Sequence, residues 1–223
     1  MMNQTDANPA LGMDLFLKSN PAEMDAKAFC SYKKGQQVYL PHQQARHLYL
    51  IVKGCIKIST FADDGQEMVR SVLFEEEIFG EEAIASPTSQ RDAYAVAQEE
   101  KTILYRLSVD AFNILMSTDP DLGKKLIVLM AQRVTQTARE KEVIKLKSAY
   151  EKVISYLKDT ATRRGKKVGF ETMFESNLTH KDIANLLGIS RQTVTSLLNS
   201  LKKRNLINFN RKRFLIRDLS KLA

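Results

Sequence analysis

The hydrophobic pattern of the chain changes once, after Leu107, and this change limits the possible folds more than any other feature. From residue 29 to residue 107, short apolar segments alternate with turns, a spacing typical of a small antiparallel barrel or jelly roll. From Asp119 to Lys147 there is no proline after residue 120 and no glycine after residue 123, and apolar residues recur at helical spacing. The sequence therefore predicts an α+β protein in which an N-terminal β-roll precedes a long helix.

The N-terminal part, residues 1–118, is expected to form one domain. Its strand-like segments cover residues 48–52, 56–61, 68–74, 93–97 and 102–107. Between the second and third of them lies Asp64-Gly65, a dipeptide that strongly favours a hairpin turn. Further upstream, residues 14–19 have the pattern of a short amphipathic turn or helix.

Residues 120–147 are expected to form one helix with two apolar faces. One face has heptad spacing and carries Ile127, Met130, Val134, Thr137, Lys141 and Ile144. The opposite face carries Leu126 and Leu129 and is expected to pack inward. We therefore predict that residues 119–147 act as a dimerisation helix of a homodimer; a helix that packs only on its own domain is the alternative.

A C-terminal domain is expected at residues 148–223, with a helix at 148–161 and a polar loop at 162–167. Further on, Thr179 fits the cap of a helix, with Asp182 three residues later. Gly188 fits a tight turn that requires a positive φ, and Ser190 fits the cap of a second helix at 191–203. The small residue at 184 and the apolar residues at 183, 187, 189, 194 and 197 complete the spacing of a helix-turn-helix.

The net charge is concentrated around this motif. Residues 176–223 contain ten Lys or Arg residues and two acidic residues, so this segment carries the whole formal excess of +8. Residues 1–175 are balanced. An excess confined to one short segment indicates a polyanionic partner.

The polar face of the second helix is the candidate for reading double-stranded DNA. The N-terminal residues of a recognition helix reach base edges in the major groove; Arg suits guanine and Gln suits adenine. A hairpin expected at 206–217 has a basic tip that is placed to contact phosphates. The candidate DNA-binding residues are Thr179, Ser190, Arg191, Gln192, Thr195, Ser196, Asn199, Arg211, Lys212 and Arg213.

Five segments of the chain form a characteristic set, namely LYLIVKG at 48–54, DGQE at 64–67, IFGE at 78–81, MAQRV at 130–134 and GISRQTV at 188–194. In these segments, and over nearly its whole length, the chain resembles the Crp–Fnr family of bacterial regulators. The resemblance implies a β-roll of the cyclic-nucleotide-binding type, a dimerisation helix and a C-terminal winged helix-turn-helix. It also implies a homodimer on a near-palindromic DNA site, which contacts RNA polymerase if it is an activator.

The resemblance also implies an effector site. Gly80, Glu81 and Arg91 match the family's phosphate-binding cassette, in which the arginine would neutralise a cyclic phosphate and the glutamate would accept from a ribose hydroxyl. Arg133 matches a position near that glutamate, and Thr137 matches the position that contacts the base in cyclic-AMP binders. Asp92 departs from the family because binders have Ser or Thr there; the acid would repel phosphate and could instead pair with Arg91.

Three interpretations of this site therefore stay open: a cyclic nucleotide such as cAMP, another small effector, or a vestigial pocket. Haem is disfavoured because no His or Cys accompanies Gly80-Glu81-Glu82, and two cysteines are too few for a four-cysteine iron–sulfur site. Cys30 and Cys55 are expected to be reduced, buried or half-buried thiols. A redox role for either cysteine is the alternative.

Other function classes find less support. The three histidines show no zinc-ligand spacing, and no nucleophile–base motif or phosphate loop appears, so we expect no metal site and no catalytic residues. With no long apolar run and no basic-then-apolar leader, we expect a cytoplasmic protein without a membrane partner. A cyclic-nucleotide-binding module that acts through a protein partner is the alternative to a DNA-binding regulator.

Overall fold

A computed structural model describes residues 28–86, 88–210 and 212–222. The chain divides into two compact units, and the boundary between Gln136 and Thr137 falls inside a long helix. The segment 14–19 and Arg211 lie outside the described residues. In the described part, no helix is both long enough and apolar enough to span a membrane.

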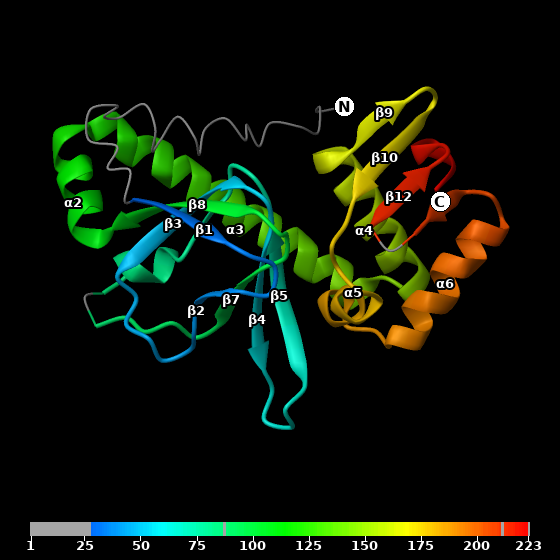
Figure 1. Cartoon of the computed structure of the whole chain (residues 1–223), viewed down its shortest axis with the longest axis horizontal. Helices are drawn as coiled ribbons and strands as arrows, with labels where there is room; N and C mark the ends of the chain where they lie inside the picture. The colour runs from blue at the N-terminus through cyan, green and yellow to red at the C-terminus, as the bar shows by residue number, and fades with distance from the viewer. Residues whose placement is uncertain (1–27, 87, 211, 223) are drawn as a thin grey trace. The chain divides into compact units, whose positions relative to one another are not determined.

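The first unit contains two four-stranded antiparallel sheets (Figure 1). One sheet has the order β1 (Phe29–Tyr32), β8 (Thr102–Ser108), β3 (His47–Lys53), β6 (Ile78–Phe79). The other has the order β2 (Gln37–Tyr39), β7 (Tyr94–Ala97), β4 (Ile56–Phe61), β5 (Glu67–Leu73). The five predicted strands are all present, with ends that differ by at most one residue. The prediction of an N-terminal β-roll is therefore confirmed.

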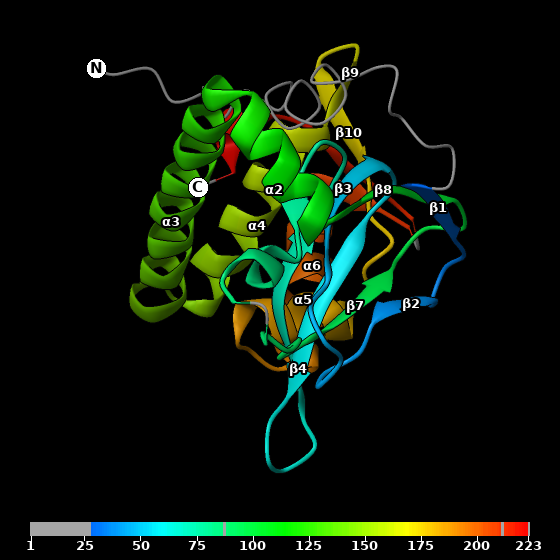
Figure 2. The same ribbon diagram turned by 90° about the vertical axis from the view of Figure 1, so that its left-hand side faces the viewer.

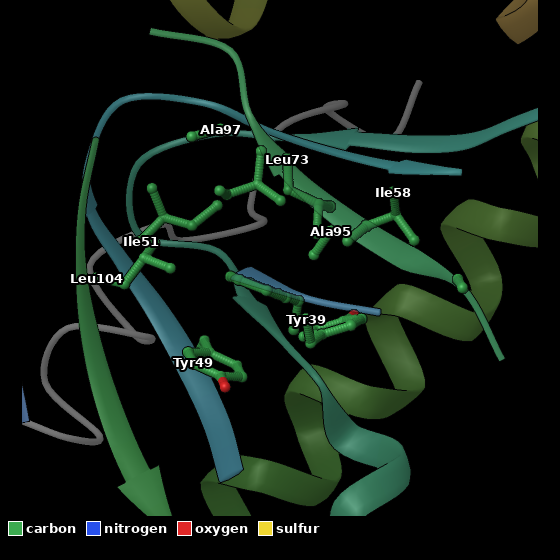
Figure 3. Close-up of a cluster of buried hydrophobic side chains, with 11 residues drawn as sticks. Tyr39, Tyr49, Ile51, Ile58, Leu73, Ala95, Ala97 and Leu104 are labelled. Atoms are coloured by element: carbon green, nitrogen blue, oxygen red, sulfur yellow. The ribbon is translucent and has the colours of Figure 1, made fainter. Parts of the chain in front are cut away.

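The core of this unit lies between the two sheets (Figure 3). Tyr49 and Ile51 of β3 belong to this core, whereas Leu48 and Leu50 belong to a second cluster with Leu107, Phe112 and Leu126. Successive side chains of a strand point to opposite faces, so β3 buries both of its faces. This explains why residues 48–52 form a continuous apolar run instead of an alternating one.

Two helices, drawn as ribbons in Figures 1 and 2, contribute side chains to the second cluster. These are α2 (Val109–Thr118), which the sequence did not predict, and α3 (Pro120–Leu146). The buried Leu126 confirms the predicted inward face of α3. Met130 was assigned to the opposite, heptad face, but it is half-buried and packs against this cluster. The heptad residues Ile127 and Val134 are each 70% exposed; the side chains of Leu129, Lys141 and Ile144 lie outside the description.

Beyond the end of α3, the second unit combines three α-helices and a short 3-10 helix, η4 (Leu219–Lys221), with a four-stranded antiparallel sheet of order β11-β12-β10-β9. Its elements are α4 (Ala149–Arg164), β9 (Lys166–Val168), β10 (Glu171–Glu175), α5 (His180–Leu187), α6 (Arg191–Lys203), β11 (Ile207–Phe209) and β12 (Arg213–Ile216). The expected hairpin 206–217 is present as β11 and β12. The prediction of a polar loop at 162–167 was wrong, because α4 continues to Arg164 and β9 begins at Lys166. In this unit the sequence analysis missed β9 and β10, and in the first unit it missed β1, β2 and β6.

Candidate nucleic-acid interface and effector cassette

Local capping interactions fix the helix-turn-helix. Thr179 and Asp182 form a reciprocal capping box at the start of α5. Gly188 ends α5 with φ 63°, a left-handed conformation that favours glycine. Ser190 caps α6 by accepting from the backbone N–H of Thr193. All three local predictions are confirmed.

Packing orients α6 within this unit. Val194, Leu198 and Leu201 are at most 1% exposed, and α6 contacts α4, α5 and β11. Burying these side chains against the rest of the unit removes one face of the helix from water. The opposite face is therefore held outward in a fixed rotation about the helix axis.

The outward face gathers most of the predicted DNA-reading residues. One shared surface hollow is lined by Ser190, Arg191, Gln192, Thr195, Ser196 and Asn199. Arg191, Gln192, Ser196 and Asn199 are exposed and Thr195 is half-buried. Among the residues that the structure describes, no acidic side chain pairs with Arg191. This surface presents hydrogen-bonding groups and positive charge to a partner that approaches α6.

Two of the predicted contact residues already use their hydroxyls within the protein. The Thr179 hydroxyl accepts from the Asp182 N–H at 3.1 Å and donates to the Asp182 carboxylate at 2.6 Å. The Ser190 hydroxyl accepts from the Thr193 N–H at 3.0 Å and lies 2.8 Å from its hydroxyl. Their side chains thus serve first to start the two helices.

His180 is a residue of this surface that sequence reasoning missed. Its Nδ1 lies 3.0 Å from the hydroxyl of Thr195, which itself donates to the Arg191 carbonyl at 3.0 Å. This contact links the start of α5 to the outward face of α6. Burial, and then the charge of Arg191, lower the pKa of His180. No sequence motif marks His180, because its contact with Thr195, fifteen residues later, depends on the packing of α5 against α6.

The wing is the β11–β12 hairpin, whose turn is closed by Asn210. The Asn210 side chain accepts from the N–H groups of Lys212 and Arg213 at 2.9 Å each. Lys212 is exposed. Arg213, 60% exposed, pairs with Glu175 of β10 at 3.1 Å. Lys212 is therefore the described wing residue that remains available to a polyanion.

In the first unit, Gly80 and Arg91 form the centre of the predicted effector cassette. Gly80 has φ 83° and precedes a short 3-10 helix, η3 (Glu81–Ile84). A Cβ on Gly80 would lie 2.9 Å from the Arg91 guanidinium and 3.0 Å from the His47 carbonyl oxygen. Only glycine leaves the arginine this space.

Arg91 is 2% exposed and is held from several sides. Its guanidinium donates to the Gly80 carbonyl at 3.0 Å and to the His47 carbonyl. It also pairs with the Glu82 carboxylate at 2.9 Å, and it lies over the Tyr39 ring, 4.3 Å from the centroid. Burial, and then Glu82, raise the pKa of Tyr39.

The suggestion that Asp92 pairs with Arg91 was wrong. Asp92 pairs with Arg70 of β5 at 2.7 Å, and both side chains are largely exposed. Arg91 and Asp92 both precede β7, and Asp92 is exposed while Arg91 is buried, so the two side chains lie in different surroundings. Glu82, which the sequence analysis did not single out, is the partner instead.

The two remaining effector candidates lie on α3. Arg133 pairs with Glu81 at 3.1 Å and donates to the Ile78 carbonyl at 2.7 Å. The expected proximity of Arg133 to the cassette glutamate is thus observed. Thr137 is exposed and belongs to the second unit. Cys30 is half-buried and Cys55 is buried, as predicted, and the two cysteines form no disulfide.

Comparisons with known proteins match both units. The cyclic nucleotide-binding domain family matches residues 29–119, and the Crp-like helix-turn-helix domain family matches residues 151–223. A CRP-like cAMP-activated global transcriptional regulator of Mycobacterium tuberculosis is 26% identical over 192 residues, which cover 86% of this chain and 85% of that protein. The global nitrogen regulator of Synechococcus elongatus is 23% identical over 185 residues, 83% of either chain.

Solved structures share the fold. The structure of FixK2 from Bradyrhizobium japonicum has a TM-score of 0.76 at 19% identity, and the match covers 87% of this chain and 94% of that one. The curated relatives are transcriptional regulators and not enzymes. The β-roll, the capped helix-turn-helix and these matches together show that the chain belongs to the Crp–Fnr family of transcriptional regulators.

Proposed function

We propose that the protein regulates transcription as a homodimer that binds a specific DNA sequence through α6, and that its β-roll is the domain through which an effector modulates binding. The exposed polar face of α6 carries this proposal. It presents Arg191, Gln192 and Asn199 together, and these are side chains that can form paired hydrogen bonds with base edges. If the protein is an activator, RNA polymerase is a further partner.

Base readout is assigned to the N-terminal end of α6. Arg191 and Gln192 occupy its first two positions, the end that enters the major groove in dimeric helix-turn-helix proteins. Lys202 and Lys203 lie at the other end, and Lys212 lies on the wing. These three positive charges are assigned to phosphates, which position the protein but carry no sequence information directly.

The apolar residues that α3 exposes support a dimer. Ile127 and Val134 lie seven residues apart, and each is 70% exposed. A second copy of the same helix would cover both, as in a coiled coil with heptad spacing. Two copies of α6 would then enter successive major grooves about 34 Å apart.

Selection from random DNA with the purified full-length protein tests sequence-specific binding. We expect a near-palindromic site whose half-sites lie about 10 base pairs apart. No enrichment of any sequence would contradict specific regulation. Enrichment of a single unpaired half-site would contradict the dimer but not the assignment of α6.

Light scattering tests the dimer directly. The 25.3 kDa chain is expected to have twice this mass at micromolar concentration. Val134→Glu is expected to weaken the dimer, because pairing would bury an unpaired charge. Val128→Glu is the matched control, since Val128 is outside the heptad positions on the same helix. Equal effects of both substitutions would show that the heptad face is not the contact.

A further inference from the structure

The phosphate position of the effector cassette already holds an anion. Arg91 is the residue that the family resemblance assigns to a cyclic phosphate, yet its guanidinium contacts two carbonyl oxygens and the Glu82 carboxylate. At 2% exposure, Arg91 has little access to water. A buried guanidinium needs a partner of opposite charge, and among the described residues Glu82 is that partner.

Glu82 is held where it can perform this role permanently. It belongs to η3, which begins directly after Gly80, and it is 30% exposed while it pairs with Arg91. A tethered carboxylate competes with a dissolved anion at a high effective concentration, about millimolar or more for short tethers. A cyclic nucleotide would have to displace this carboxylate and leave its negative charge beside its own phosphate, which is repulsive.

The other charges of the cassette are paired as well. Glu81 pairs with Arg133, and Asp92 pairs with Arg70. Asp92 therefore lies against another arginine and does not compete for Arg91. The group that stands between Arg91 and an external anion is Glu82, two residues after the glycine that lets Arg91 approach.

We propose that the Glu82 carboxylate occupies the position on Arg91 that a cyclic phosphate would take, and that Glu82 thereby prevents the β-roll from binding cyclic nucleotides. The inference rests on the proposed function only in treating the β-roll as the effector domain. Arg91 then stays paired with Glu82 in the absence of a nucleotide, and an effector of this protein must be recognised by groups other than the Arg91 guanidinium.

Calorimetric titration of the full-length protein with cyclic AMP and cyclic GMP tests this role. The wild-type protein and Asp92→Ser are expected to show no binding at millimolar nucleotide. Glu82→Gln, which removes the charge and keeps the volume, is expected to gain affinity by about tenfold or more. Glu100→Gln, at an exposed loop position, is the matched control and is expected to behave as the wild type.

A second substitution shows whether the gained affinity uses the proposed site. Arg91→Ala in the Glu82→Gln background is expected to abolish it. The melting temperature of Glu82→Gln is expected to rise with added nucleotide, because a bound phosphate replaces the missing carboxylate, while that of the wild type stays constant. Circular dichroism checks that each variant is folded.

Three outcomes would overturn the proposal. They are nucleotide binding by the wild type that depends on Arg91, a gain in Asp92→Ser without one in Glu82→Gln, and no gain in a folded Glu82→Gln. If Glu82→Gln does not fold, Glu82→Asp replaces it, because the shorter side chain keeps the charge but withdraws it from Arg91. Nucleotide binding by Glu82→Asp would then support the proposal, and its absence would overturn it.

DNA binding is measured on the same samples, so the two proposals can fail separately. The affinity of the wild type for its selected DNA site is expected to be unchanged by millimolar cyclic nucleotide. A protein that binds no DNA would contradict the proposed function, while the titrations would still decide the role of Glu82.

Discussion

The α6 face and the effector cassette each centre on an arginine, but the two arginines differ in what surrounds them. Arg191 is exposed on α6, and among the described residues no carboxylate pairs with it. Arg91 is buried among two carbonyl oxygens, a carboxylate and an aromatic ring. Water satisfies an exposed guanidinium at no cost, whereas a buried one must find its partners inside the protein. Arg191 is therefore available to an external partner, whereas Arg91 already has an internal one.

The largest expected effect concerns stability. Arg91→Ala is expected to lower the free energy of unfolding of the first unit by about 3 kcal/mol, because it breaks a buried ion pair and strands two carbonyl oxygens. Arg191→Ala is expected to change the free energy of unfolding of the second unit by less than about 0.5 kcal/mol, since it removes an exposed side chain. Urea unfolding with a probe in each unit measures both. Similar losses for the two variants would contradict the contrast.

For DNA affinity the order is expected to be reversed, with the larger effect at Arg191. Arg191→Ala is expected to cost about 1–3 kcal/mol per half-site and to relax preference at one base, if Arg191 pairs with guanine. Titration against the selected DNA site and a scrambled control measures this. An equal loss on both fragments would make Arg191 a phosphate contact.

A smaller and sequence-independent effect is expected from the wing. Lys212→Ala is expected to weaken binding to the selected and scrambled DNA alike and to reduce the log–log salt slope by about one unit for each phosphate that the lysine neutralises. Arg213→Ala sharpens the test, because Arg213 already pairs with Glu175. We expect Arg213→Ala to change the slope less than Lys212→Ala does. The reverse order would show that the ion pair opens on DNA.

The smallest effect is a pH dependence. The pKa of His180 in the folded protein lies below its ordinary value of 6.5, so the folded state binds fewer protons than the unfolded state. Its contribution to stability is complete above pH 6.5 and is lost as the pH falls below that value toward the folded pKa. His180→Gln is expected to flatten the fall in melting temperature of the second unit between about pH 7 and pH 5.

His47 supplies an internal control for this prediction. Burial, and then Arg106, lower its pKa in the same direction, but His47 lies in the first unit. The acid sensitivity of the first unit should therefore survive His180→Gln. If it disappears as well, the two units do not unfold independently and the assignment to His180 is not supported.

The features that the sequence predicted well are those that neighbouring residues produce. A cap and its partner lie three residues apart, as with Thr179 and Asp182, and Gly188 alone provides the left-handed turn. The heptad arithmetic was less reliable, because Met130 packs against the first unit. Periodicity assigns a residue to a face of a helix. For a residue at the border between two faces, tertiary packing decides whether it is buried or exposed.

A weak local signal explains why the strand β9 was missed. All three residues of β9 are exposed, so this edge strand has no apolar alternation and its sequence has the composition of a loop. Only its pairing with β10 makes it a strand. Likewise, His180 carries no motif, and its contact with Thr195 depends on how α5 packs against α6.

The sequence by itself determined the order of the units, the two helices of the DNA-reading motif and the residues on the outward face of α6. Capping, turn formation and helical periodicity act over a few residues, so they can be seen in one segment of the chain. Tertiary structure alone decided the partner of Arg91. Glu82 and Asp92 are both acids close to it in the chain, and the geometry of η3 and the strands places only Glu82 against the guanidinium. Because Arg91 is buried, its charge needs a partner of opposite sign inside the protein, and the fold provides Glu82.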